Sequence, residues 1–163
     1  MLRASGGIIS VMKRLLGFAL LLGVGLTAQS TSMESTFLAL KDANAPRPAL
    51  SHKLATEIAL LAKKSGRDQS LKQPTVARFS EDLTTALLGK DITAVRAAAL
   101  QKAIARVLSG KGSTFDPATS FREALVSCGV DDRTVQAVIG RLIDIGQEIR
   151  GPDDLGVQPK RLK

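Results

Sequence analysis

The amino-acid sequence predicts an all-α protein, a small helical bundle of about five helices that follows an N-terminal signal peptide. Three observations support this fold class. No segment of strand length alternates apolar and polar residues. Apolar residues instead recur at three- and four-residue spacing in segments that Gly or Pro bounds. The 163-residue chain contains no Trp or Tyr and only five Phe, so its core must be built mainly from aliphatic residues, which suits close helix packing.

The first 28 residues have the features of a secretory signal peptide. A pair of basic residues precedes the twelve apolar residues 15–26, and small residues follow them for cleavage after Ala28. Met12 opens this pattern directly and is therefore an alternative start. Twelve apolar residues are too few to span a hydrocarbon core of about 30 Å, which takes roughly 20. We expect export to the periplasm or the outside of the cell, with no membrane span after cleavage.

The rest of the chain divides into a spacer, a helical domain and a tail. Residues 29–50 begin with small polar residues and contain two prolines, which predicts a flexible spacer with room for one short helix. Residues 51–151 carry the regular apolar spacing and form the predicted helical domain. Residues 152–163 are mostly polar and predict a mobile C-terminal tail.

Five helices are expected in this domain, each bounded by a start signal and a glycine: 51–66, 74–89, 91–110, 116–129 and 131–151. Ser51 is expected to cap the first of them, Asp91 the third, and Asp131 or Asp132 the fifth. The second and third helices are joined by a corner in which Gly89 precedes Asp91. The fourth and fifth are joined in the same way by Gly129 and Asp131. This repetition predicts two αα-hairpins packed face to face, with the first helix laid across them.

The positive charge of the chain is concentrated in its first half. The formal net charge is +8, and residues 41–111 contain 13 Lys and Arg against 6 Asp and Glu, whereas residues 115–163 contain 7 against 8. Such an excess forms an ordinary solvated surface or attracts an anionic partner. The candidate binding residues surround the predicted loop between the first two helices: Lys53, Lys63, Lys64, Arg67, Lys72 and Arg78.

No residue pattern predicts a catalytic, cofactor or metal site. His52 is the only His, so a zinc site would have to take its other ligands from Cys128 and scattered carboxylates. The Gly-Lys pair at residues 110–111 lacks the upstream Gly and the preceding strand of a phosphate-binding loop. Cys128 leaves two interpretations open, a small buried apolar residue or an exposed thiol that forms an intermolecular disulfide.

These features favour an exported, non-enzymatic helical protein that acts by binding. The expected partner is an anionic polymer, a lipid surface or a protein, engaged through the basic first half. Nucleic acid is not favoured, because a chain without Trp or Tyr offers few aromatic platforms for bases. Two alternatives stay open: an enzyme whose carboxylates and Lys converge only in the folded chain, and a self-assembling protein with an uncovered apolar stripe. The oligomeric state is left open as well.

Overall fold

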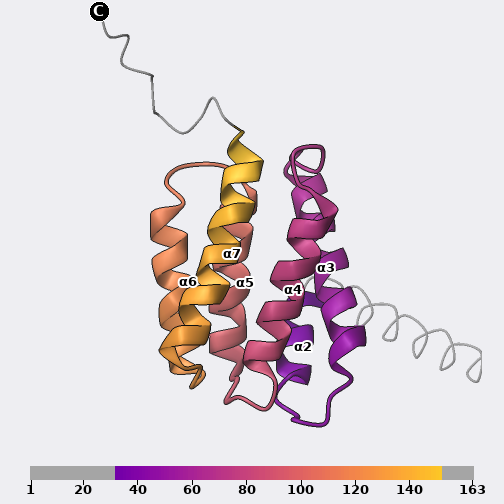
Figure 1. The fold of residues 1–163 in the computed structure, drawn as a ribbon, viewed down its shortest axis with the longest axis vertical. Coiled ribbons are helices and arrows are strands. Elements are labelled where there is room, and N and C mark those ends of the chain that lie inside the picture. Colours follow the sequence, from indigo (N-terminus) through magenta and orange to yellow (C-terminus); the bar gives the residue numbers. More distant parts are fainter. Residues whose placement is uncertain (1–31, 152–163) are drawn as a thin grey trace, which may run out of the picture. The chain divides into compact units, whose positions relative to one another are not determined.

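We describe the fold from a computed structural model, in which residues 32–151 are described. These residues form six α-helices and no strand: α2 (Ser32–Ala39), α3 (Arg47–Lys64), α4 (Gln73–Leu87), α5 (Ala94–Leu108), α6 (Phe115–Ser127) and α7 (Asp132–Arg150) (Figure 1). The prediction of an all-α bundle is confirmed. The expected signal peptide with Met12 and Ala28, and the expected tail 152–163, lie outside the described residues.

Helices α3 to α7 alternate in direction and lie side by side (Figure 1). Helix α3 packs on α4, α4 on α7, and α5 on both α6 and α7. The expected second hairpin, α6–α7, is present. The expected first hairpin would join α4 and α5, which follow one another through the corner at Gly89. Helix α4 instead packs mainly on α3 and α7. The hairpins with the most extensive packing are therefore α3–α4 and α5–α6.

The helical unit begins earlier than the sequence predicts. The region expected to be a spacer contains α2 and the first turn of α3, and Met33, Phe37 and Leu40 of this region are buried in the core. Pro48 does not end a helix here. It occupies the second position of α3, where the N–H that Pro lacks has no partner within the helix. Ser51, expected to cap this helix, lies inside it.

One apolar core joins the six helices. Phe79 of α4 and Phe121 of α6 meet within it, fully buried, with ring centroids 6.1 Å apart and planes tilted by 40°. The stripe predicted on the last helix is buried along its whole length: Val135, Val138, Leu142, Ile145 and Ile149. All buried apolar residues that the structure describes lie between residues 33 and 149, so the compact unit Met33–Lys163 has a core of its own.

The residue that caps the helix is the predicted one for α7 and a different one for α5. Asp131 caps α7 as expected, since its carboxylate accepts the Thr134 N–H at 3.0 Å. Helix α5 is capped by Thr93, whose hydroxyl oxygen accepts the Arg96 N–H at 3.3 Å. Asp91, the expected cap, instead pairs with the Arg96 guanidinium at 2.6 Å. No helix within residues 32–151 is long and apolar enough to cross a membrane.

Candidate anion-binding end of the helical bundle

The alternating helices gather their loops at two ends of the bundle (Figure 1). We call residues 63–72, 106–116 and 148–151 the basic end, and residues 41–47, 88–96 and 128–133 the opposite end. The basic end carries three acids, Asp68, Asp116 and Glu148, and seven cations: Lys63, Lys64, Arg67, Lys72, Arg106, Lys111 and Arg150. The opposite end carries five cations and four acids, so its charge is nearly balanced.

The cations of the basic end form no ion pair with any carboxylate in the described part of the chain. The four ion pairs found there join Lys53 to Glu57, Arg96 to Asp91, and Arg141 to both Asp82 and Asp144. Lys63, Lys64 and Lys111 are exposed to solvent. Their charges are therefore not neutralised by neighbouring side chains.

Helix termini explain part of this accumulation of charge. Helices α3, α5 and α7 all end at the basic end, and a cation in the last turn of a helix offsets the negative end of its dipole by about 0.3–1 kcal/mol. Lys63 and Lys64 of α3, Arg106 of α5 and Arg150 of α7 occupy such last turns. Lys111 lies in the loop after α5, so the dipoles do not account for it.

Two of the seven cations lie against the loop between α5 and α6. The guanidinium of Arg67 lies beside Gly110, since a β-carbon placed on that glycine would be 3.4 Å from Arg67 Cζ. Arg150 donates a hydrogen bond from Nη2 to the Gly112 carbonyl oxygen of the same loop and so fixes it. The other five cations are exposed and open to a partner.

A cleft of about 550 Å³ lies between α4 and α7, beside the basic end. Its charged lining is Lys72, Arg78, Arg141, Asp144 and Glu148. Glu148 holds the start of α4 in place, since its carboxylate accepts the Lys72 N–H at 3.0 Å and the Thr75 hydroxyl at 2.5 Å. The Glu148 carboxylate of α7 thus acts as a cap for the start of α4 on the other side of the cleft.

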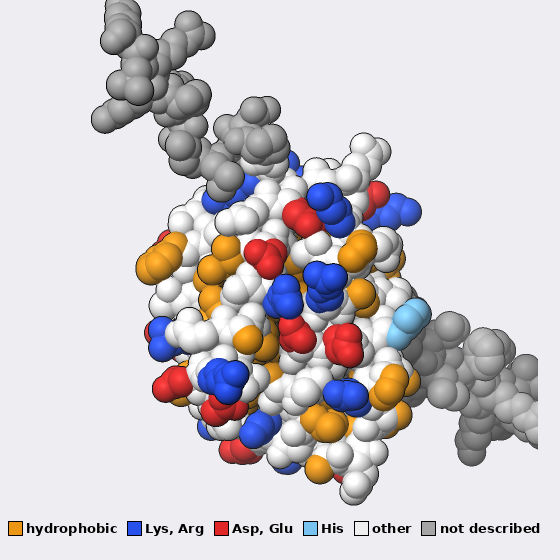
Figure 2. All heavy atoms as spheres, in the orientation of Figure 1, with side chains coloured by type: hydrophobic (Ala, Val, Ile, Leu, Met, Phe, Trp, Pro, Cys, Tyr) orange, Lys and Arg blue, Asp and Glu red, His pale blue; other side chains and the backbone are white. Residues whose placement is uncertain are grey.

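The ionisable groups of the cleft meet as the enzyme alternative requires, but Arg141 is already paired with carboxylates. Arg141 donates from Nε to Asp82 at 3.1 Å and lies 4.0 Å from Asp144. Figure 2 shows Lys and Arg side chains interspersed with Asp and Glu on the face that α4 and α7 form. Because opposite charges cancel over such short distances, this face attracts an anion less than the basic end does.

The structure brings together four of the six predicted binding residues. Lys63, Lys64, Arg67 and Lys72 share the basic end. Lys53 lies ten residues before Lys63, about 15 Å along α3, with its ammonium group 4.0 Å from the Glu57 carboxylate.

The sixth predicted residue, Arg78, lies further along α4 and lines the cleft. The structure also adds three cations that the sequence analysis missed, Arg106, Lys111 and Arg150, which come from the ends of α5 and α7. These cations would have been found if the C-terminal ends of alternate predicted helices had been assigned to the same end of the bundle.

Cys128 and His52 lie away from the basic end. Cys128 is only 1% exposed, as expected for a small buried residue, and burial raises the pKa of its thiol. An intermolecular disulfide would require this side chain to reach the surface. His52 lines a hollow of about 300 Å³ with Ser51 and Glu81, but its imidazole has no hydrogen-bond partner in the described part of the chain. No three His, Cys, Asp or Glu side chains within residues 32–151 are placed to hold a metal ion.

The chain matches no known protein-family model, and no characterised protein or solved structure is significantly similar to it. Its function is therefore argued from the site itself.

Proposed function

We propose that the protein is exported to the periplasm or the cell exterior and acts, without catalysis, by binding an anionic component of the cell envelope through its basic end. The observation that carries this proposal is the excess of seven cations over three acids at one end of the bundle. A surface with charge of one sign attracts a partner of the opposite sign and speeds the encounter between them.

The arrangement of the basic end supports binding better than it supports the alternatives. Its cations are unpaired with carboxylates, whereas in the α4–α7 cleft Arg141 is paired with Asp82 and Asp144. The Glu148 carboxylate of that cleft is occupied by the start of α4. The large exposed apolar side chains are spread over five helices instead of forming one stripe, which weakens the case for self-assembly: Leu38, Leu60, Val95, Phe115, Val126 and Ile143.

Export is tested by the mass of the mature protein. The basic pair and the twelve apolar residues before Thr27 support cleavage after Ala28. We expect the intact mass of protein from the exported fraction to show that the first 28 residues are missing. Full-length chain embedded in a membrane would contradict this part of the proposal.

Binding is tested by retention of residues 29–163 on phosphocellulose over a series of salt concentrations. Replacement of Lys63, Lys64 and Lys111 by Gln removes three exposed cations without disturbing Arg67 or Arg150. We expect this variant to elute at lower salt and to show a flatter salt dependence, because each lost cation–phosphate contact reduces the number of counterions released on binding.

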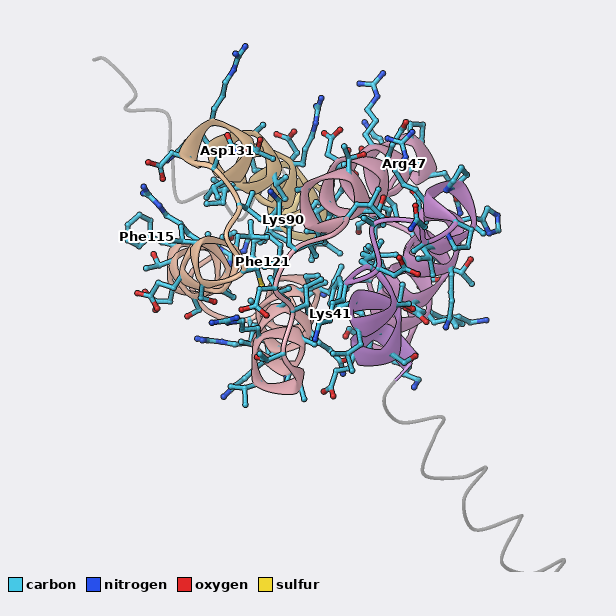
Figure 3. The ribbon with its side chains drawn as sticks, turned by 90° about the horizontal axis from the view of Figure 1, so that it is seen from below. Lys41, Arg47, Lys90, Phe115, Phe121 and Asp131 are labelled. Atoms are coloured by element: carbon cyan, nitrogen blue, oxygen red, sulfur yellow. The ribbon has the colours of Figure 1, made fainter. Side chains whose placement is uncertain are left out.

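The matched control removes the same charge from the opposite end by replacing Lys41, Lys90 and Arg133 with Gln. Figure 3 labels Lys41 and Lys90 at this end. It should elute close to the parent protein, because these residues lie away from the proposed contact. If both variants lose the same retention, only the net charge matters, and the basic end is an ordinary solvated surface.

A further inference from the structure

We propose that the partner of the basic end is the surface of an anionic lipid bilayer, and that Phe115 inserts its ring into that surface. This inference rests on the proposed function and names its partner. It starts from a feature that charge alone does not explain, an aromatic side chain in solvent among the cations.

Phe115 is exposed although it is large and apolar. Its exposed fraction is 77%, whereas the other Phe residues within 32–151, Phe37, Phe79 and Phe121, are fully buried. Figure 3 shows Phe115 directed away from the helices while Phe121 of the same helix α6 lies within them. A single exposed apolar side chain is ordinary by itself. Phe115 differs because its ring projects from the loop that carries Lys111 and that Arg150 contacts, so that one partner surface could cover the ring and pair with the cations together.

The exposure of Phe115 is set by a well-packed loop. Thr114, the residue before it, packs so closely on α7 that a β-carbon added to Gly146 would lie 2.8 Å from its Cγ2 atom. The Ser113 hydroxyl oxygen accepts the Phe115 N–H at 3.0 Å. With Arg150 bound to the Gly112 carbonyl oxygen, the loop is anchored on α7 at two residues between Lys111 and Phe115, Gly112 and Thr114. The ring therefore projects from a fixed support.

The surroundings of Phe115 match an anionic bilayer better than a soluble polymer. Lys111 lies in its own loop, Arg106 precedes that loop, and Arg150 contacts it. Asp116 is the acid beside it in the first turn of α6. A bilayer surface offers anionic headgroups to the cations and an apolar boundary to the ring. A soluble polyanion would satisfy the cations and leave the ring in water.

Insertion of the ring at position 115 can be measured by Trp fluorescence, because the chain contains no Trp of its own. Phe115→Trp in residues 29–163, which include the compact unit Met33–Lys163, gives a single fluorescent reporter at the proposed contact. Val95→Trp is the matched control, since Val95 is 80% exposed and lies at the opposite end.

Vesicles of phosphatidylglycerol and phosphatidylcholine are the probe for both variants. The indole emission of the Phe115→Trp variant should shift to shorter wavelength and be quenched by lipids brominated on their acyl chains, because the ring enters the apolar boundary. The emission of the Val95→Trp variant should not respond. Neither variant should respond to vesicles of pure phosphatidylcholine.

Affinity for the same anionic vesicles gives a second readout. We expect Phe115→Ser to lower it about tenfold or more, because the ring is no longer buried on binding. Lys111→Gln should lower it about fivefold, as expected for one cation near a charged surface. Val95→Ser should leave it unchanged.

The outcomes separate this inference from the proposed function. Vesicle binding that is unchanged in Phe115→Ser, or binding without an emission shift in Phe115→Trp, would overturn insertion and leave a purely electrostatic contact. Retention on phosphocellulose without vesicle binding would identify a soluble anionic polymer as the partner and overturn this inference alone. Absence of both would overturn the proposed function as well.

Discussion

The two ends of the bundle are built in different ways. At the opposite end, α5 and α7 begin with side chains of their own, Thr93 and Asp131, which each accept an N–H three residues later. At the basic end, α4 and α6 begin without such a local cap. Helix α4 instead takes its cap from Glu148, which lies 76 residues after Lys72. The two helix starts at the opposite end are thus capped by their own side chains, whereas the start of α4 at the basic end is capped by a distant helix.

This difference determines what the helix starts at each end depend on. The loops of the opposite end also contact one another, since the Gly89 N–H donates to the Leu40 carbonyl oxygen at 2.8 Å and the Asp91 N–H to that of Cys128 at 3.2 Å, but its helix caps are local. The basic end acquires its geometry when α7 docks against α4 and the α5–α6 loop. The residues that close the basic end, Glu148 and Arg150, come from the last helix. Binding through the basic end should therefore depend on the complete fold, and disturbing α7 should affect it more than disturbing any cap of the opposite end.

The largest expected effect comes from the core of α7, which both ends share. Leu142 is fully buried at the centre of the apolar stripe of this helix. Leu142→Ala leaves a cavity and should lower the free energy of unfolding by about 2–5 kcal/mol, measured by denaturant titration. Ile143→Ala is the control on the same helix, because Ile143 is 37% exposed and should cost much less. Equal losses in the two variants would mean that the stripe does not face the core.

A smaller effect is expected where α7 meets the α5–α6 loop. Gly146→Ala gains helix propensity, but its β-carbon would lie 2.8 Å from Thr114 Cγ2. We expect a net loss of about 1–3 kcal/mol in unfolding free energy from this overpacking. Gly140→Ala, in the same helix with open space around it, should instead stabilise by roughly 0.5–1 kcal/mol. The two thermal melting curves should shift in opposite directions. Stabilisation of both variants would show that the α5–α6 loop shifts to accommodate the added β-carbon at little cost in free energy.

Removal of the long-range cap tests the basic end alone. Glu148→Ala takes the acceptor from the Lys72 N–H and the Thr75 hydroxyl, and should cost about 1 kcal/mol, as the loss of a helix cap does. Hydrogen exchange should accelerate at the first turn of α4. Gln147→Ala, which changes a neighbouring exposed side chain of the same cleft, should leave exchange there unchanged. If the first turn of α4 exchanges equally slowly in both variants, water replaces the Glu148 carboxylate as hydrogen-bond acceptor without loss of stability.

Features that depend on local spacing could be predicted from the sequence. The stripe from Val135 to Ile149 repeats with the helical period, so its burial follows from that period and is confirmed. The cap at Asp131 is equally local. Helix α2 is the one short helix for which the predicted spacer left room, but its burial was not predicted. It is only eight residues long, and it is held by contacts with distant residues, such as the hydrogen bond from the Glu34 N–H to the Gln101 side-chain oxygen at 3.1 Å.

The candidate site was predictable only in part, because its residues come together through topology. Lys63 to Lys72 are close in sequence and could be grouped from it. Lys111 and Arg150 join them because α3, α5 and α7 run in the same direction, which no linear count of charge reveals. Phe115 resembles the buried Phe residues in sequence, and only the fold of its loop shows that the ring is exposed.

The smallest expected effect concerns the pH dependence of the local cap at the opposite end. The pKa of Asp131 lies below its usual value, first because the Thr134 hydroxyl donates to the carboxylate at 2.7 Å and next because the Thr134 N–H does so at 3.0 Å. A carboxyl group whose pKa is lower in the folded chain stabilises the fold when ionised. This contribution is complete above the unfolded pKa of about 3.9 and is lost as the pH falls through the lower folded value.

An NMR titration should therefore place the Asp131 midpoint below that of a model peptide. Asp131→Asn keeps a capping oxygen without an ionisable group, so its stability should fall less than that of the parent between neutral pH and the acid limit. Because Asp131 is exposed and its effect is local, the basic end should keep its affinity for anionic vesicles in this variant, and loss of that affinity would show that the two ends are coupled.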